Sequence, residues 1–407
     1  MANMHRSEFL DRLDVKEYLN AQNWSTSIGG TYLEPEVLEV MKEVSQTFVD
    51  IRELHDKACV RIAELCQVDS AYITAGAAAG IVLCTAACIA GTQSARWKTL
   101  PFTEDPPING RNQIIIQATQ LAYKEQFTAG GARLVQVGGP LGCKLKEIEE
   151  AVTEKTVAIA AGYHYNIVPG GWVPYEKVTE VARKHNLPCF CDAAGVFPPY
   201  VNLHKLSDWG FDLVIFSGGK GIRGPQETGL ILGKGERGKK LIKAIKDHSS
   251  PNFGFGRAFK VSKECIAGIV VALEIALGRG EQKEYEKQLS KAKYMVKQLE
   301  DIPGISVSVV PNDGKTYEHP LMARVPNVKI DIDKAALGLD TVGKIYDAMR
   351  NGEPGIFIRS PRFEDPEFGP FTNRASVFLF TYYLRDGEEE IVAKRMREVL
   401  TKCPWRR

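Results

Sequence analysis

The stretch from Phe211 to Gln226 constrains the fold of this chain more than any other, because it joins a buried strand to an isolated lysine. The apolar run Phe211–Phe216 is typical of a parallel strand that is covered on both faces. Two glycines precede Lys220 and a third follows it. Because glycine has no side chain, both the backbone and a bulky group can approach the lysine amine. Such a lysine is a candidate for bonding a carbonyl group, although an ordinary turn lysine fits the same pattern.

A second apolar run, upstream, ends in a carboxylate at Asp192, which only the small residues Ala193–Gly195 follow. In an open α/β sheet, ligands bind beyond the carboxyl ends of the strands, so Asp192 and Lys220 are expected at one edge of the sheet. This pair is typical of a pyridoxal-phosphate site. The aspartate pairs with the protonated pyridine nitrogen, and the lysine holds the aldehyde as an imine. A helix N-cap is the alternative role for Asp192.

The turn after a short strand beginning at Ser70 is made of glycine and alanine, and a helix starts there at once. Side chains as small as those of Ala77 and Ala78 leave the first amide N–H groups of the helix open, and a helix N-terminus with open amides binds anions. In a pyridoxal enzyme the anion is the cofactor phosphate. Tight helix packing would explain the same composition.

Other candidate site residues follow further strands. After the strand 112–117, Tyr123 or Gln120 could stack on the cofactor ring, and after the buried strand 156–162, Asn166 could hydrogen-bond the phenolic oxygen. Four residues are candidates for binding the substrate: Thr26, in a loop of small residues; Arg257 and Lys260, in a glycine-rich aromatic loop; and Arg359, at a strand end. Arginine there can clamp a carboxylate with two hydrogen bonds, while solvated turn or strand-end charges are the plainer alternative.

The composition describes an ordinary globular protein of 407 residues with 44% apolar and 25% charged residues. A net charge of +2 favours neither a nucleic-acid surface nor a funnel for acidic substrates. The beginning of the chain has no apolar signal segment, and the apolar run near Ala77–Gly91 is too short for a membrane span and is expected to be a buried helix. Nine scattered cysteines, an odd number, predict a reduced cytoplasmic protein without a metal site.

Strands and helices alternate up to Leu230–Leu232, a run with the pattern of an edge strand, so the predicted fold class is α/β. We expect an N-terminal segment at residues 1–50 that packs with the small domain, a large domain at 51–285 with a mostly parallel sheet, and a small C-terminal α+β domain at 286–407.

Five stretches, in the order in which they occur, resemble the selenocysteine synthase-like group of fold-type-I pyridoxal-phosphate enzymes. Within that group they resemble the D-glucosaminate-6-phosphate ammonia-lyase branch. The stretches are Thr74–Ala78, Asn166, Asp192–Ala194, Ser217–Gln226 and Gly256–Glu264. The resemblance runs from about Asn20 to the last helix. It implies a homodimer or larger assembly with sites at subunit interfaces, and a seven-stranded type of sheet. It also implies that Ser217 helps Ala77 and Ala78 to hold the phosphate, and that Arg257 and Lys260 serve the active site of a neighbouring subunit.

One departure from the ammonia-lyase branch concerns the strand 112–117. Relatives commonly have a histidine with adjacent basic residues after it, whereas this chain has Gln117–Tyr123. The ring-stacking residue and the substrate therefore stay open.

The leading functional hypothesis is β-elimination or β-replacement on an amino acid, with Lys220 as the base that takes the Cα proton. Racemase and aldolase activities use the same carbanion and stay open. A catalytically inactive partner-binding homologue is an alternative of another class, and selenium transfer on a charged tRNA would need a more basic surface than a net charge of +2 provides.

Overall fold

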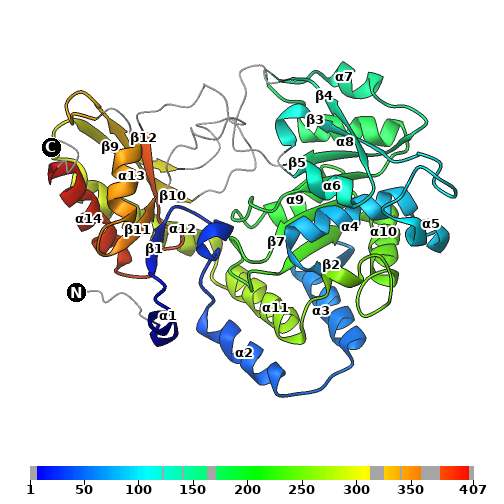
Figure 1. Ribbon diagram of the computed structural model, residues 1–407, viewed down its shortest axis with the longest axis horizontal. Coiled ribbons are helices and arrows are strands. Elements are labelled where there is room, and N and C mark those ends of the chain that lie inside the picture. Colours follow the sequence, from blue (N-terminus) through cyan, green and yellow to red (C-terminus); the bar gives the residue numbers. More distant parts are fainter. Residues whose placement is uncertain are drawn as a thin grey trace. The chain divides into compact units, whose positions relative to one another are not determined.

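The computed structural model describes residues 7–121, 123–139, 142–162, 171–311, 325–339, 342–358 and 376–402. The chain divides into two compact units, a larger one of Thr31–Gly278 and a smaller one of Met1–Gly30 with Arg279–Arg407. Figure 1 labels the elements of both. Among the described residues, none of the helices has the length and apolar character needed to cross a membrane.

The larger unit is built on a seven-stranded sheet with the order β2-β8-β7-β6-β5-β3-β4 (Figure 1). The strands are β2 (Ser70–Thr74), β3 (Gln113–Gln117), β4 (Arg133–Val137), β5 (Thr156–Gly162), β6 (Cys189–Asp192), β7 (Leu213–Ser217) and β8 (Gly229–Gly233). Neighbours from β7 to β4 pair in parallel, and β8 runs antiparallel to both β2 and β7. The predicted α/β class with a mostly parallel sheet is confirmed.

One detail of that prediction is wrong, because Leu230–Leu232 is not an edge strand. It forms the middle of β8, which lies between β2 and β7, while β2 and β4 are the edges. The five residues of β8 are all buried, as expected for a strand with neighbours on both sides and helices over its faces. Nothing in so short an apolar run indicates which strands it pairs with.

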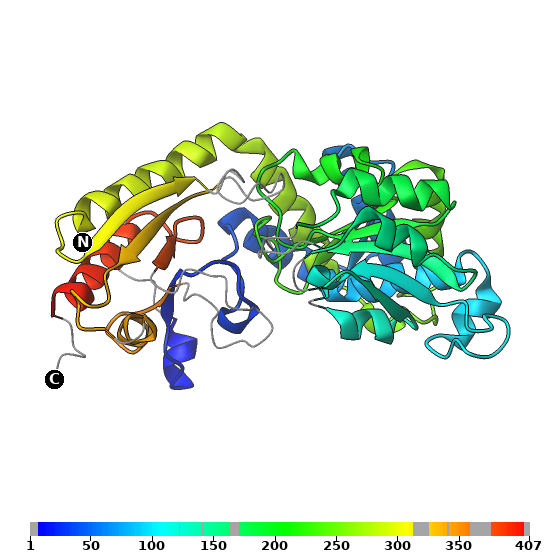
Figure 2. The ribbon, with the colours of Figure 1, turned by 90° about the horizontal axis from the view of Figure 1, so that it is seen from above.

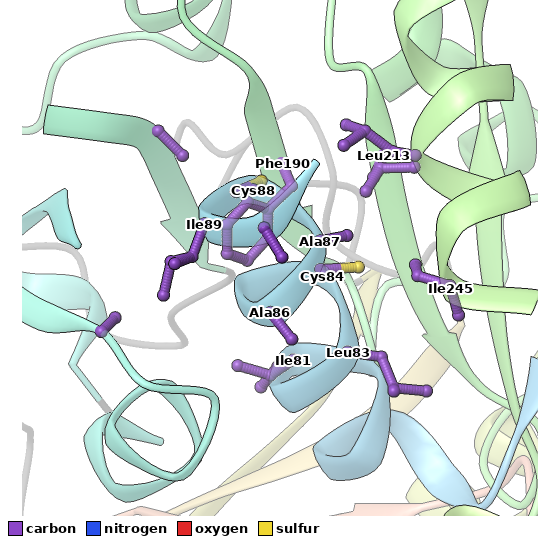
Figure 3. Packing of buried hydrophobic residues seen from close by; sticks show 14 of the residues in the cluster. Ile81, Leu83, Cys84, Ala86, Ala87, Cys88, Ile89, Phe190, Leu213 and Ile245 are labelled. Atoms are coloured by element: carbon purple, nitrogen blue, oxygen red, sulfur yellow. The ribbon is translucent and has the colours of Figure 1, made fainter. Parts of the chain in front are cut away.

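The predicted buried helix is α4 (Gly76–Ala90), which is apolar all round and buried over most of its length. Its side chains pack with residues of the sheet and of α10, among them Phe190, Leu213 and Ile245 (Figure 3). The other helices of this unit are α2 (Pro35–Ser45), α3 (Ile51–Leu65), α5 (Ser94–Thr99), α6 (Lys124–Ala129), α7 (Leu145–Glu150), α8 (Tyr175–Lys184), α9 (Asn202–Asp208), α10 (Gly235–Asp247) and α11 (Lys263–Gly278).

The smaller unit contains two sheets. In one, β1 (Tyr18–Ala21) pairs in parallel with β11 (Gly355–Ile358), and in the other β10 (Pro326–Ile332) lies between β9 (Ile305–Pro311) and β12 (Ser376–Phe380), antiparallel to both. The helices are α1 (Glu8–Arg12), α12 (Glu281–Leu299), α13 (Gly343–Arg350) and α14 (Glu388–Lys402). Helix α12 lies along β9 and β10 (Figure 2). Strand β1 shows that the first residues of the chain complete the fold of its last third.

Candidate active site

The two residues that define the predicted site follow neighbouring strands of the sheet. Strands β6 and β7 pair in parallel with Asp192 opposite Ile215, and the N–H of Ala193 donates to the Ile215 carbonyl at 2.8 Å. Lys220 follows β7 in a turn closed by a 3.0 Å hydrogen bond from the Arg223 N–H to the Lys220 carbonyl. The structure thus places both residues at the carboxyl edge of the sheet, as predicted.

Asp192 is partly buried, in surroundings that disfavour the ionised carboxylate. Burial raises its pKa, while the positive charge of Lys220 and a 3.0 Å hydrogen bond from the Ala194 N–H to Oδ1 lower it. The pairing of β6 with β7 and the effect of the Lys220 charge both indicate that the two groups lie near each other. A partly buried carboxylate of this kind suits a protonated ring nitrogen, which supplies both a charge and a hydrogen-bond donor.

The predicted phosphate end lies where β2, β8 and β7 meet. Gly229, the first residue of β8, lies opposite Thr74 on one side and opposite Ser217 on the other. A Cβ atom on Gly229 would lie 2.5 Å from the Gly76 carbonyl carbon and 2.8 Å from the Ala77 nitrogen. Only glycine therefore allows the first turn of α4 to rest against the sheet here. Through this contact Ala77 and Ser217 come to the same end of the sheet.

Thr74 is a residue that the sequence reasoning did not select as a site residue. Its side chain is fully buried, and its hydroxyl has no hydrogen-bond partner among the described residues. A buried hydroxyl without a partner at the carboxyl end of β2, directly before the turn that opens α4, fits a place for a polar ligand. A threonine at a strand end carries no sequence signal for this role.

The two candidates for ring stacking differ in their surroundings. Tyr123 is the N-cap residue of α6 and is 43% exposed. Gln120 is buried at the end of the 3₁₀ helix Ala118–Gln120, and its Oε1 accepts a 3.2 Å hydrogen bond from the N–H of Gly162 at the end of β5. Through this hydrogen bond Gln120 lies at the carboxyl edge of the sheet. A stacking role for Tyr123 stays a prediction.

None of the hydrogen bonds or ring contacts described for Arg257 and Lys260, two of the predicted substrate residues, links them to Lys220. Arg257 begins the 3₁₀ helix Arg257–Phe259 and is exposed, donating to Ser250 Oγ at 2.8 Å and lying 5.5 Å from the Phe253 ring centroid. Lys260 is the exposed residue after this turn. Both therefore belong to an exposed loop, and their roles stay predictions.

Three more predicted residues are not tested by geometry. Thr26 is exposed in the 3₁₀ helix Thr26–Ile28 of the smaller unit. Asn166 and Arg359 lie outside the described residues.

A buried ion pair beside the lysine turn was not predicted. Arg223, three residues after Lys220, pairs with Glu34 at 3.3 Å, and its guanidinium lies 5.3 Å from the Tyr32 ring centroid. Arg223 also has a φ of 60°, a conformation that non-glycine residues rarely adopt. The stretch Tyr32–Glu34 thus helps to hold the Lys220 turn. Glu34 and Arg223 are 189 residues apart, so local sequence patterns give no sign of their pairing.

The sequence pattern of the family described as aminotransferase class-V matches residues 114–340. Three curated relatives are similar over most of the chain. The 5'-C-glycyluridine monooxygenase-decarboxylase of a Streptomyces species is 29% identical over 404 residues, covering 97% of this chain and 92% of that protein. The D-glucosaminate-6-phosphate ammonia lyase of Salmonella typhimurium is 25% identical over 395 residues, covering 95% and 96%. The L-seryl-tRNA(Sec) selenium transferase of Aquifex aeolicus is 23% identical over 385 residues, covering 85% and 78%.

The solved structure of a D-glucosaminate-6-phosphate ammonia-lyase matches with a TM-score of 0.79 and 23% identity, covering 98% of this chain and all of that one. The chain therefore has the α/β fold of the type-I pyridoxal-phosphate enzymes. The resemblance to the selenocysteine synthase and ammonia-lyase group is confirmed.

Proposed function

The chain belongs to the aminotransferase class-V family, whose members depend on pyridoxal phosphate, and we propose that it binds this cofactor and acts on an amino acid at Cα as a lyase or transferase. The observation that carries the proposal is the position of the partly buried Asp192 at the end of β6 and of Lys220 just after the neighbouring β7, where the lysine charge acts on the carboxylate. This is where an α/β sheet binds its ligand, and the two groups are the ones the cofactor needs.

The residues of this chain would hold the cofactor at two ends. The backbone N–H groups of Ala77 and Ala78, at the start of the 15-residue helix α4, and the hydroxyl of Ser217 would bind the phosphate. Asp192 would hold the proton of the ring nitrogen between that nitrogen and its own carboxylate. Tyr123 as the stacking residue and Asn166 as a donor to the phenolic oxygen complete the proposed set.

In the reaction, Lys220 has the role of a base. When bound, pyridoxal phosphate withdraws electrons from the Cα of the amino acid that is joined to it. The amine Nζ of Lys220, at the same edge, would take the Cα proton and later return it or pass it to a leaving group. Asp192 would keep the ring nitrogen protonated throughout, because a partly buried carboxylate and a protonated nitrogen stabilise each other's charge.

Loss of a β-substituent after this step gives elimination with release of ammonia and a keto acid, and addition of a new one gives β-replacement. The similarity to the ammonia lyase and to the selenium transferase favours these two outcomes. The similarity to a monooxygenase-decarboxylase, the highest identity of the three, favours a second candidate, in which Cα loses its carboxyl group instead of its proton. Racemase and aldolase activities are alternatives on the same scaffold.

The proposal includes a homodimer or larger assembly, in which Arg257 and Lys260 reach the active site of a neighbouring subunit. Thr26 and Arg359 are the further proposed contacts to the substrate, and the cytoplasm is the proposed location. A role as an inactive partner-binding homologue is disfavoured because it would leave Asp192 and Lys220, which follow neighbouring strands at the ligand-binding edge of the sheet, without a function.

The test is the visible absorption spectrum of the purified protein before and after borohydride reduction, with peptide mapping of the reduced adduct. A yellow protein whose adduct maps to Lys220 supports the proposal, and amino acids are then screened for release of keto acid, ammonia and carbon dioxide. Ammonia without carbon dioxide selects the lyase, and carbon dioxide selects the decarboxylase. A protein that does not bind added pyridoxal phosphate, or an adduct on another lysine, overturns the proposal.

A further inference from the structure

Two glutamines near the end of β3 have the same side chain but opposite hydrogen-bonding states. The side-chain amide of Gln117 makes two hydrogen bonds to the backbone of Val173. Its Oε1 accepts from the Val173 N–H at 2.8 Å, and its Nε2 donates to the Val173 carbonyl at 3.3 Å. Gln120 uses only Oε1, which accepts from the Gly162 N–H at 3.2 Å. Its Nε2 is buried and has no hydrogen-bond partner among the described residues.

The orientation of the Gln120 amide follows from this one contact. A backbone N–H needs an acceptor, so the oxygen of the amide must be the atom that faces Gly162. The NH₂ group, which can only donate, is then turned away from Gly162. The residue as a whole is only 4% exposed. A buried donor without an acceptor is unfavourable, so a donor that has none among the described residues suits an acceptor on a bound ligand.

The position of this donor is defined by the sheet. Gly162 lies opposite Asp192 in the parallel pairing of β5 with β6, and neighbouring strands are about 4.8 Å apart. Seen from Asp192, Ser217 and the start of α4 lie on the side of β7 and β8, whereas Gln120 lies on the side of β5 and β3. The free NH₂ group is therefore at the edge of the site away from the phosphate end.

We propose that Nε2 of Gln120 donates a hydrogen bond to an anionic oxygen of the bound ligand, on the side of Asp192 opposite the phosphate. The inference rests on the proposed function, and makes Gln120 a polar anchor and not a ring-stacking residue. Two oxygens have this chemistry, the phenolate of the cofactor ring and the carboxylate of the amino-acid substrate. The amide is neutral, so it binds either oxygen without adding a charge that would compete with Lys220.

The test compares Gln120→Glu with wild type and with Gln117→Glu. Gln120→Glu keeps the size and the acceptor for Gly162 but replaces the donor by an oxygen. Gln117→Glu makes the same chemical change three residues away, where Nε2 meets only a backbone carbonyl. For each protein, the dissociation constants of pyridoxal 5'-phosphate, of its 3-O-methyl analogue and of inorganic phosphate are measured on the apoprotein, together with the melting temperature.

If the acceptor is the phenolate, Gln120→Glu weakens the binding of pyridoxal phosphate by roughly 10- to 100-fold. The affinities for the 3-O-methyl analogue and for inorganic phosphate stay unchanged. If the acceptor is the substrate carboxylate, the affinity for pyridoxal phosphate stays the same. The spectral response of the loaded protein to a panel of amino acids then weakens by the same factor, and its response to the corresponding amines does not. Gln117→Glu lowers the melting temperature but none of these affinities.

A Gln120→Glu protein that matches wild type in all of these measurements overturns the inference, as does a Gln117→Glu protein with the same losses. Failure of the proposed function looks different, because wild type itself would then not bind pyridoxal phosphate. Gln120→Leu serves as the second variant, since it removes the donor without introducing a negative charge. Loss of affinity in Gln120→Glu that Gln120→Leu does not share would come from charge repulsion and would also overturn the inference.

Discussion

Lys220 lies close enough to Asp192 for its charge to lower the pKa of a carboxyl group that burial raises. Burial is the larger of the two influences, so in the protein alone the pKa of Asp192 lies above its ordinary value. The site is therefore short of positive charge around Asp192. A ligand with a protonated ring nitrogen supplies the missing positive charge. The ionised Asp192 carboxylate, which destabilises the folded apoprotein, then stabilises the bound ligand.

The first prediction concerns Asp192→Asn. Because the folded-state pKa of Asp192 is raised, ionisation favours the unfolded chain, and stability is lost as the pH rises from the ordinary aspartate value of about 3.9 through the folded-state pKa. Asparagine does not ionise, yet its oxygen can still accept from the Ala194 N–H. We expect the apoprotein variant to be at least as stable as wild type at pH 7 and to bind pyridoxal phosphate more weakly.

Urea unfolding of both apoproteins at pH 4 and pH 7, with a cofactor titration, checks this. The advantage of the variant shrinks toward pH 4, since the wild-type carboxyl then keeps its proton in the folded state and regains it in about half of the unfolded chains. An apoprotein that is clearly less stable than wild type at pH 7 would contradict the argument from burial.

The second prediction concerns Lys220→Ala. Removing the amine abolishes the borohydride-trapped adduct and lowers turnover by about 10²- to 10⁴-fold or more, because the variant lacks the base for the Cα proton. Lys220→Arg is the matched control, since it keeps the positive charge near Asp192 but no longer offers an amine that can lose its proton. Both variants should be inactive, while only Lys220→Ala raises the pKa of Asp192 further. An adduct that persists in either variant would show that another lysine is used.

The third prediction uses the two glycines that begin and end β8. A Cβ on Gly229 meets the backbone of Gly76 and Ala77, whereas a Cβ on Gly233 meets Ser70 Oγ at 2.5 Å and Ile242 Cγ1 at 2.8 Å. Both alanine variants should lose about 1–3 kcal/mol of stability through overpacking. Only Gly229→Ala should also weaken the binding of pyridoxal phosphate and of inorganic phosphate, because it displaces the first turn of α4. If the two variants bind pyridoxal phosphate and inorganic phosphate equally well, Gly229 does not shape the phosphate site.

The fourth prediction concerns the buried ion pair of Arg223 and Glu34. Arg223→Met removes the guanidinium from a side chain of Glu34 that is only 16% exposed, and we expect a loss of about 1–3 kcal/mol in urea unfolding. The double variant Arg223→Met with Glu34→Gln should recover part of the loss, because it leaves no carboxylate behind. If the two single losses simply add in the double variant, the pair is not coupled.

The fifth prediction concerns thiols. The eight described cysteines are all buried, and burial raises the pKa of Cys59 and Cys66 to about 12. Thiolates are the reactive form, so these cysteines should not react quickly at pH 8. A thiol-specific chromogenic reagent should label at most one cysteine per chain of the native protein, since Cys403 lies outside the described residues, and all nine after unfolding. Two or more fast thiols would contradict the burial.

The residues that could be predicted from sequence are those with a local signature. The strands ending at Asp192 and Ser217 are continuous apolar runs, and burial on both faces requires such runs. The polar groups just beyond them then follow from the rule that ligands bind at carboxyl ends. The helix after Ala75 was predictable as well, because a run of small apolar residues indicates a buried helix.

What could not be predicted depends on partners that are distant in the chain. The place of β8 between β2 and β7 is a matter of pairing and not of composition. Thr74 at the end of β2 and Gln120 in the 3₁₀ turn after β3 are ordinary polar residues, and only the structure shows that Thr74 Oγ1 and Gln120 Nε2 are buried without partners among the described residues. No pattern in the sequence distinguishes Gln120 from Gln117, although their contacts differ completely.

The pairing of β2 with β8 has a consequence for the order in which the protein is made. Ser70 and Gly233 are 163 positions apart in the sequence, and among the described strands only β8 pairs with β2. The first turn of α4 rests on that same strand through Gly229. During synthesis, β2 and α4 therefore leave the ribosome long before the strand that supports them, and contacts so distant in sequence form slowly. Until β8 is made, the surfaces of β2 and α4 that it covers in the folded protein have no partner strand on the nascent chain.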